Sequence, residues 1–275
     1  MSERRDLVGG SDVAALLGVS PWSTPFTVWD RIVNGTPMEE TEIMLEGRLI
    51  EPFLAARHLS KRPHTNFVAG PELRHPRTPY AIGHLDAVTD EAVLEFKAVH
   101  WSKRASWDNG IPAHVQLQVD HYLQCADRPR AEVGAFFGLG DFRIYDFTPL
   151  SEDVRGGIIE VIERFWRDHV ETKIAPPMGD TRRSAEQYLA WIYREHPVAN
   201  ETELALDPET TDLAKQYIAI NKDLAQMGAA KTFLKAELVK RMGSNKWGVG
   251  PGVKVTCVSV RGAKPSRKLE VEETA

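Results

Sequence analysis

The stretch from Tyr80 to Lys97, YAIGHLDAVTDEAVLEFK, constrains the fold more than any other part of the chain. Two runs rich in apolar and β-branched residues flank the polar residues 89–91, which is the pattern of a β-hairpin. Asp86 lies near the end of the first run. Alternation along the second run places Glu95 and Lys97 on the face opposite its apolar residues. We therefore expect two carboxylates and one amine to converge on one face of a hairpin.

Two carboxylates and a lysine are the groups that metal-assisted hydrolysis of a phosphodiester uses. Hard carboxylate oxygens hold Mg²⁺, the metal activates a water molecule, and the amine orients that water or stabilises the developing charge. The alternative is a solvated hairpin face with a salt bridge, because an Asp followed by Glu-x-Lys also occurs by chance. The surrounding sequence has to decide between the two interpretations.

The first thirty residues contain a helix start that could bind an anion. Ser11 follows two glycines and precedes the apolar run 13–17, which predicts that it caps a helix. A helix N-terminus with a hydroxyl and with Arg4 or Arg5 nearby can also hold a phosphate. Composition alone does not decide whether Ser11 only caps the helix or also helps to bind an anion.

A longer helix is predicted from about Thr41 to Ser60, and Glu51 is its candidate functional residue. Gly47 lies one turn before Glu51 on the same face, so this face is open to an approaching group. Pro52 removes a backbone hydrogen bond and is expected to bend the helix. The alternative is an exposed glutamate on an amphipathic helix.

The segments after the hairpin contain aromatic, basic and amide side chains. Residues 99–110 interleave histidine, tryptophan, lysine and arginine, which suits either base stacking or a surface loop with buried tryptophans. Pro112 then opens a helix to Cys125 with an apolar stripe on one face and Gln116 on another. Two strands and a long helix follow. Alternating helices and strands of this kind predict an α/β (α+β) fold with a mixed central β-sheet flanked by helices.

Composition restricts the class of protein. The 275 residues carry a formal net charge of -5, which argues against coating nucleic acid by bulk electrostatics but permits a local basic track. The two cysteines lie in no metal-type spacing, and there is no apolar run of membrane-spanning length, so a cytoplasmic setting without a membrane is expected. The candidate track consists of basic side chains near the expected site: Arg4, Arg5, Arg57, Lys61, Arg62, His64, Lys103 and Arg104.

A proline- and glycine-containing segment at 175–180 predicts a domain boundary. We expect residues 1–175 to form the core and residues 176–275 to form an extension of helices, a β-hairpin and a mobile tail. The extension includes a long helix, 208–242, whose apolar positions alternate three and four residues apart.

Residues 1–175 resemble the YqaJ-type viral recombinase family, which includes the phage lambda-type exonuclease and belongs to the PD-(D/E)XK nuclease superfamily. The resemblance rests on motifs that occur in the family's order: GGSDVAALLGVSPW, EGRLIEP, GHLDA, LEFK and VQLQVDHYL. It implies a restriction-endonuclease-like core. The sequence departs from the family in one place, where a leucine replaces the proline that often precedes the motif aspartate.

The resemblance also implies roles for individual residues. Metal ligands are implied at Asp86, Glu95, the backbone carbonyl of Phe96, and Glu51. Lys97 is implied to act on the nucleophilic water, and Gln116 to lie at the same site. Arg4 and Ser11, with Arg5 as the alternative arginine, are implied to receive a terminal 5′ phosphate.

These readings together predict a Mg²⁺-dependent DNA exonuclease, with Mn²⁺ as a substitute, that digests one strand of linear double-stranded DNA from its 5′ end during phage-type recombination. A homotrimer around DNA and a single-strand annealing protein as partner are implied by the resemblance alone. Two alternatives stay open: an endonuclease of restriction or repair type on the same core, and a DNA-binding module that has lost catalysis.

Overall fold

The computed structural model describes residues 6–37, 41–64, 66–198, 203–260 and 266–274. The chain divides into two compact units, residues 1–198 and 199–275, and each is described separately.

The central element of the first unit is a five-stranded sheet of order β2-β5-β6-β7-β8. β6 and β7 are parallel, and the other neighbouring pairs are antiparallel. The strands of this sheet are β2 (Val68–Ala69), β5 (Ala87–Val88), β6 (Ala92–Ala98), β7 (Arg130–Gly138) and β8 (Asp141–Phe147). The mixed sheet that the sequence predicts is therefore confirmed.

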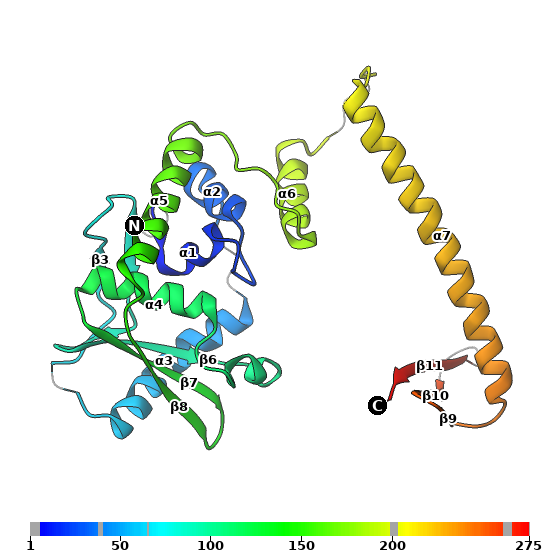
Figure 1. Ribbon diagram of the computed structural model, residues 1–275, viewed down its shortest axis with the longest axis horizontal. Helices are drawn as coiled ribbons and strands as arrows, with labels where there is room; N and C mark the ends of the chain where they lie inside the picture. The colour runs from blue at the N-terminus through cyan, green and yellow to red at the C-terminus, as the bar shows by residue number, and fades with distance from the viewer. Residues whose placement is uncertain (1–5, 38–40, 65, 199–202, 261–265, 275) are drawn as a thin grey trace. The chain divides into compact units, whose positions relative to one another are not determined.

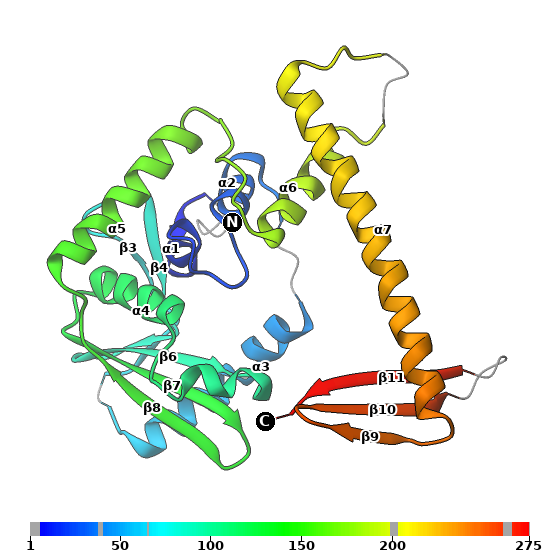
Figure 2. The same cartoon turned by 45° about the vertical axis from the view of Figure 1, so that its right-hand side comes forward.

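Two helices cover opposite faces of this sheet, as Figures 1 and 2 show. α4 (Ala113–Ala126) packs with Val93 and Val133 in one apolar cluster. α3 (Glu42–Lys61) contributes Leu54 to a second cluster with Leu94 and Phe96. Because side chains alternate along β6, its two faces pack against different helices. Glu95 and Lys97 share the α4 face with Val93.

A third layer covers α4. It contains α1 (Gly10–Leu16), α2 (Pro25–Asn34), α5 (Glu152–Phe165) and the single π-helical turn η3 (Trp166–Val170), which share an apolar cluster. A small sheet of order β1-β4-β3 joins this layer, with β1 (Val8–Gly9), β3 (Glu72–Arg74) and β4 (Ala81–His84). The 3₁₀ helix η2 (Trp101–Trp107) follows β6.

The run before the hairpin turn, residues 80–88, is not one strand. β4 belongs to the small sheet, and only the two residues of β5 pair with β6. The chain changes sheets at Leu85 and Asp86, where the Leu85 side chain is buried in the core under α4. The expected hairpin is therefore short, and Asp86 lies at the change of direction.

The first unit extends beyond the expected boundary at residue 175. α6 (Arg182–Glu195) packs on α2: the ring centroids of Tyr188 and Trp191 lie 4.9 and 5.4 Å from that of Phe26. Arg194 also forms an ion pair of 2.7 Å with Asp30. These aromatic contacts attach α6 to the core, so residues 176–198 belong to the compact unit rather than to the extension.

The second unit consists of one long helix and a small sheet. α7 (Pro208–Met242) is continuous through the glycine at 228, and its residues are mostly exposed within the unit. The sheet has the order β11-β10-β9, with β9 (Trp247–Gly250), β10 (Val253–Val260) and β11 (Ser266–Glu273). The expected mobile tail is wrong over β11, because these alternating residues add a third strand along the full length of β10. In the described parts of the chain, no helix is both long and apolar enough to cross a membrane.

Candidate active site

Asp86 and Glu95 are brought together by the end of the β5–β6 ladder. The last backbone pair is Ala87 with Leu94, so Asp86 is the first residue beyond the paired strands. Its Oδ2 accepts a hydrogen bond of 2.6 Å from the backbone N–H of Phe96. The carboxylate thereby replaces the strand carbonyl that would otherwise bond this N–H. This contact places Asp86 beside Glu95, the residue that precedes Phe96.

Lys97 and Glu95 form the charged centre of the site. Lys97 Nζ lies 2.6 Å from Glu95 Oε1 and donates a hydrogen bond of 3.0 Å to Oε1 of Gln118. Gln118 Nε2 donates to the same Glu95 oxygen at 3.0 Å and to the Tyr122 hydroxyl oxygen at 3.0 Å. Because Gln118 and Tyr122 are one turn apart on α4, this helix positions both charged groups of β6.

Glu51 reaches the same site from α3. Its pKa is raised from the ordinary value, first by burial and then by repulsion from Glu95, while Lys97 partly offsets both. Glu51 is therefore within electrostatic range of the two residues at the end of β6. The three carboxylates of Asp86, Glu95 and Glu51 come from three different elements, and only the fold brings them together.

The electrostatics of the site reflect an excess of negative charge. Burial raises the pKa of Asp86 well above its usual range, and the neighbouring Glu95 carboxylate raises it further. Burial opposes the charge of Lys97, but attraction to Glu95 and Asp86 outweighs it, so the pKa of Lys97 is raised. Three carboxylates thus surround one ammonium group in this cluster.

The donor set fits a hard divalent cation. Glu95 is 1% exposed, and among the described residues its Oε2 has no hydrogen-bond partner. A buried carboxylate oxygen without a partner is costly unless it meets a donor or a cation. Oxygen ligands from carboxylates are those that Mg²⁺ prefers. A bound dication would give Oε2 of Glu95 a partner. Its positive charge would also offset the burial and the repulsion that raise the pKa values of Asp86 and Glu51.

Gln116, the glutamine implied by the resemblance, is not the one that contacts these groups. Its Nε2 donates to the backbone carbonyl of Ile111 at 2.6 Å, at the start of α4. The helical phase explains the difference, because Gln118 lies one turn before Tyr122 and shares its side of α4. The Gln-x-Gln pair in the sequence pointed to a glutamine at the site. Counting one helical turn back from Tyr122 selects Gln118, the second glutamine of the pair.

Ser11 lies near the site but does not cap α1. The N-cap residue is Gly9, whose N–H donates to Asp12 Oδ2 at 2.7 Å, and Ser11 is an exposed residue of the first turn. The predicted N-cap is therefore wrong by two residues: the cap is Gly9, and the Asp12 carboxylate in the first turn accepts from the Gly9 N–H. Arg4 and Arg5 lie outside the described residues.

The start of α1 packs closely against the helix that carries Gln118. A Cβ atom placed on Gly10 would lie 2.4 Å from the Tyr122 ring, so this position requires glycine. Since the Tyr122 hydroxyl also bonds Gln118, Ser11 is one residue from a contact with the active-site network. Gly10, which directly precedes Ser11, therefore serves close helix packing.

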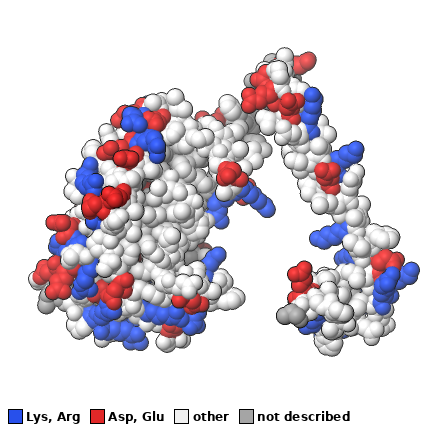
Figure 3. Space-filling view, in the orientation of Figure 1, with Lys and Arg blue, Asp and Glu red and all other residues white. Residues whose placement is uncertain are grey.

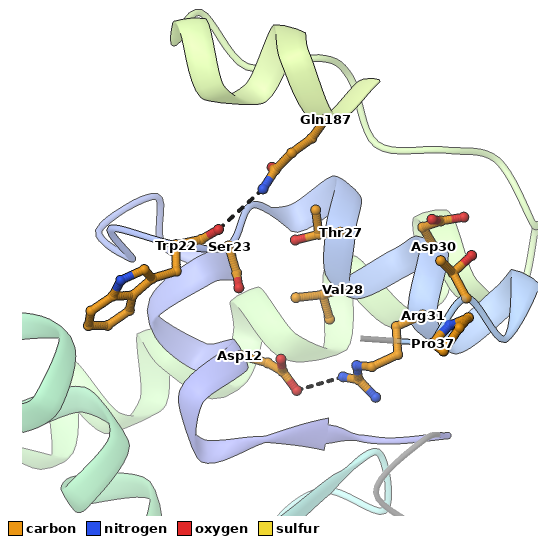
Figure 4. Close-up of a pocket in the computed structure, with 10 residues that line it drawn as sticks. Asp12, Trp22, Ser23, Thr27, Val28, Asp30, Arg31, Pro37 and Gln187 are labelled. Carbon is orange, nitrogen blue, oxygen red and sulfur yellow. Dashed lines mark hydrogen bonds and ion pairs between the residues drawn. The ribbon is translucent and has the colours of Figure 1, made fainter. Parts of the chain in front are cut away.

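A pocket beside α1 and α2 is lined by residues of the third layer and of α6 (Figure 4). Arg31 and Asp12 form an ion pair of 2.6 Å at its base. At its rim, the side chain of Gln187 donates to the backbone carbonyl of Trp22 at 3.2 Å. The Trp22 indole projects away from the pocket in this view.

A second polar cluster lies on the α3 side of the sheet. Glu132 Oε2 is 2.8 Å from His58 Nε2 and 3.2 Å from His64 Nε2, and the potential ligand atoms of the three residues lie within 4.8 Å of one another. Arg130 donates to the other Glu132 oxygen, and Arg62 lies 3.6 Å from it. Burial opposes the charge of Glu132, but Arg130 and the histidines outweigh it and lower its pKa to about 2.

This second cluster is a charge-compensated network that attaches α3 to β7. Glu132 already has two guanidinium neighbours, so a cation is not needed to neutralise it. Because Glu51 and His58 lie two turns apart on α3, the network also fixes the helix that delivers Glu51 to the site.

Members of the expected basic track are likewise engaged in ion pairs. Arg62 pairs with Asp146, and Arg104 lies 2.9 Å from Asp141. Figure 3 shows basic and acidic side chains interspersed on the visible face of the first unit. A continuous track therefore does not follow from these two arginines.

Comparisons with known proteins agree with the fold and the motifs. The family model of the YqaJ-like viral recombinase domain matches residues 1–129. This confirms the resemblance seen in the motifs. The chain is 26% identical to "Uncharacterized protein YqaJ" of Bacillus subtilis (strain 168) over 253 residues, which cover 90% of this chain and 78% of that protein.

Solved structures share the fold of much of this chain. An alkaline exonuclease, LHK-Exo from Laribacter hongkongensis, superposes with a TM-score of 0.53 at 16% identity and covers 70% of this chain and 95% of its own. The structure of LHK-Exo in complex with dAMP gives a TM-score of 0.51 at 14% identity, with the same coverage. At these identities the likeness establishes the fold.

Proposed function

We propose that the protein is a divalent-metal-dependent DNA exonuclease that hydrolyses phosphodiesters at the ends of linear double-stranded DNA. The observation that carries this proposal is the grouping of Asp86, Glu51 and Lys97 within electrostatic range of Glu95, a buried carboxylate whose Oε2 has no partner among the described residues. The YqaJ-like domain and the fold of an alkaline exonuclease support the same reaction class.

The metal would be held by the carboxylates of Asp86, Glu95 and Glu51 and by the backbone carbonyl of Phe96. We propose Mg²⁺, with Mn²⁺ as a substitute, because all these ligands are oxygens. When bound, such an ion acts as a Lewis acid on the phosphodiester and lowers the pKa of water. The protein's own contribution is to hold several carboxylates close together despite their mutual repulsion.

Lys97 serves as a donor rather than as a general base. Its raised pKa keeps the ammonium group protonated near neutral pH. Glu95 and Gln118 each engage Nζ, so the group is held in position before substrate arrives. A fixed ammonium can orient the attacking water and stabilise the negative charge that develops on the phosphate.

End recognition is assigned to the start of the chain. We propose that Ser11, with Arg4 or Arg5, binds a terminal 5′ phosphate, and that digestion runs in the 5′-to-3′ direction. The close packing of Gly10 on Tyr122 supports this, because it attaches the helix of Ser11 to the active-site network. Drawing each new end phosphate into one pocket would give processive digestion a physical basis.

The wider biological setting is proposed from the family resemblance alone. We propose that the exonuclease acts in phage-type recombination in the host cytoplasm, as a homotrimer around DNA, with a single-strand annealing protein as partner. The second unit has no assigned role in cleavage.

The test is digestion of a linear duplex labelled at one 5′ end, with or without a 5′ phosphate, beside a closed circle, in Mg²⁺ or EDTA. We expect Mg²⁺-dependent loss of the phosphorylated linear strand and an intact circle. Cutting of the circle would instead establish an endonuclease. Binding without cutting of either substrate would establish a non-catalytic DNA-binding module.

Two sets of variants separate the assigned roles. Asp86→Ala is expected to abolish cleavage. Ser11→Ala combined with Arg4→Ala is expected to remove the preference for a 5′ phosphate while cleavage persists, and Arg5→Ala is the matched variant that decides between the two arginines. An unchanged preference in all these variants would show that the phosphate binds elsewhere.

A further inference from the structure

An exposed tryptophan lies beside the candidate active site without a role in the chemistry above. The Trp22 side chain follows α1 in a loop and is 63% exposed. Its ring packs edge-to-face on His114, with centroids 5.0 Å apart and an interplanar angle of 83°. His114 is one turn before Gln118 on α4, so the two side chains lie on the same side of that helix. Gln118 in turn contacts both Lys97 and Glu95.

The electrostatics of His114 agree with this placement. Its pKa is lowered, first by burial and then by the positive charge of Lys97. His114 is therefore neutral near pH 7 and close enough to Lys97 to sense its charge. A neutral imidazole can support the indole without placing another charge at the rim of the site.

The loop that carries Trp22 is held on both sides. Ser20 Oγ accepts hydrogen bonds from the backbone N–H groups of Trp22 and Ser23, at 3.3 and 3.1 Å. On the other side, Gln187 of α6 donates to the Trp22 carbonyl. An indole on an anchored backbone loses little conformational entropy when it binds a partner.

The ring geometry leaves a binding surface. An edge-to-face pair uses the edge of one ring and one face of the other, so at least one face of the indole stays open whichever ring supplies the edge. An exposed indole next to the candidate active site is in a position to contact a bound strand. The open face of an indole suits a flat aromatic ligand, and every nucleobase has such a face.

We propose that Trp22, supported by His114, is a stacking platform for an unpaired nucleobase of the strand that the active site cuts. This inference rests on the proposed nuclease function. Delivering one strand of a duplex to the carboxylates requires the terminal base pair to open, and the separated base loses its stacking partner. Trp22 replaces that partner, and since stacking needs no hydrogen-bond pattern, the platform accepts all four bases.

The test uses the full-length protein and a duplex with 2-aminopurine, a fluorescent base that stacking quenches, at its 5′ end or at an internal position. Binding is measured in EDTA, so that no strand is cut. With the wild type, the terminal probe is expected to stay quenched. With Trp22→Ala, its fluorescence is expected to rise several-fold on binding, because the base is unpaired and has no platform. The internal probe is expected to respond equally in both proteins.

The matched variants are Trp22→Phe, which keeps an aromatic face, and Trp247→Ala, which removes a comparably exposed indole, 60% exposed, from the second unit. Trp22→Phe is expected to restore quenching and Trp247→Ala to leave it unchanged. Trp22→Ala should also raise the KM for duplex ends about 10-fold, the scale of one base–aromatic stack, with a smaller change in kcat.

The outcomes separate this inference from the proposed function. If the wild type neither binds nor cuts DNA, the nuclease proposal fails and the platform fails with it. If the wild type cuts DNA but the terminal probe behaves identically in Trp22→Ala, the nuclease stands and the platform is refuted. Loss of quenching in Trp101→Ala instead, a variant of the 76% exposed indole in η2, would assign stacking to that residue and overturn the inference.

Discussion

Asp86→Asn should stabilise the folded protein in the absence of divalent metal while abolishing cleavage. The asparagine keeps an oxygen that can accept the 2.6 Å hydrogen bond from the Phe96 N–H, so the strand end is preserved. What it removes is a buried negative charge that faces Glu95. Since burial and this repulsion raise the pKa of Asp86, the ionised form destabilises the folded state at neutral pH.

The size of the effect follows from the cost of burying a polar group without a full partner. That cost is about 1–3 kcal/mol, so we expect a gain of this order at pH 7. A folded-state pKa above the unfolded one means that the protonated form favours folding. The advantage of the variant is therefore greatest above the raised pKa of Asp86 and disappears as the pH falls towards about 4, where both proteins are neutral at this position.

A divalent metal should reverse the order of stability. A ligand that binds only the folded state adds about 2.7 kcal/mol at 100 times its Kd. We expect Mg²⁺ to stabilise the wild type and to have little effect on Asp86→Asn. Urea unfolding followed by tryptophan fluorescence is suitable, because six of the seven tryptophans lie in the first unit: residues 22, 29, 101, 107, 166 and 191.

The reasoning fails if the variant is less stable than the wild type in EDTA at every pH, because the carboxylate would then make a favourable contribution. It also fails if Mg²⁺ stabilises both proteins equally, because the ion would then bind elsewhere. Asp90→Asn, an exposed aspartate in the hairpin turn, is the control for the chemical change alone.

Three further predictions concern the surroundings of the site. Gln118→Ala should lower kcat about 10–100-fold without unfolding the protein, because Lys97 loses its amide contact. Gln116→Ala, whose side chain bonds Ile111 instead, should leave kcat nearly unchanged. Steady-state kinetics on linear duplex DNA compare the two variants. Gly10→Ala should destabilise the first unit by about 1–3 kcal/mol, since the new methyl group overlaps an aromatic ring, and thermal unfolding measures the loss. His58→Ala should cost about 2–4 kcal/mol in the same assay, because it leaves a cavity in the core and removes a hydrogen bond to Glu132; a loss under 1 kcal/mol would contradict the role assigned to this network.

The second unit shows how local sequence signals form a helix. Its long helix keeps apolar residues at alternating spacings of three and four, and several of these are exposed within the unit, such as Leu213, Ile220 and Leu224. The pattern predicts a helix, and the helix forms, because propensity and an aspartate N-cap at Asp207 suffice locally.

Local sequence rules were enough to predict the strand that carries Glu95 and Lys97. Strand alternation is a property of the backbone alone, so Glu95 and Lys97 had to share one face wherever the strand was placed. Thr24 and Pro25 form a local signal of the same kind, because the Thr24 side chain accepts from the Thr27 N–H and Pro25 is the first residue of α2. The sequence also indicated the resemblance to the YqaJ-type family, because the motifs keep the family's order along the chain, and the family model matches residues 1–129.

Tertiary structure decided which side chains actually meet. The choice of Gln118 over Gln116 depends on how α4 is rotated against β6, and that rotation is set by buried side chains such as Val115 and Val119. The docking of α6 and the pairing of β11 with β10 likewise depend on contacts between distant segments. A linear pattern specifies the period of each element, but burial against the rest of the molecule specifies its orientation, and the candidate site is made where these orientations converge.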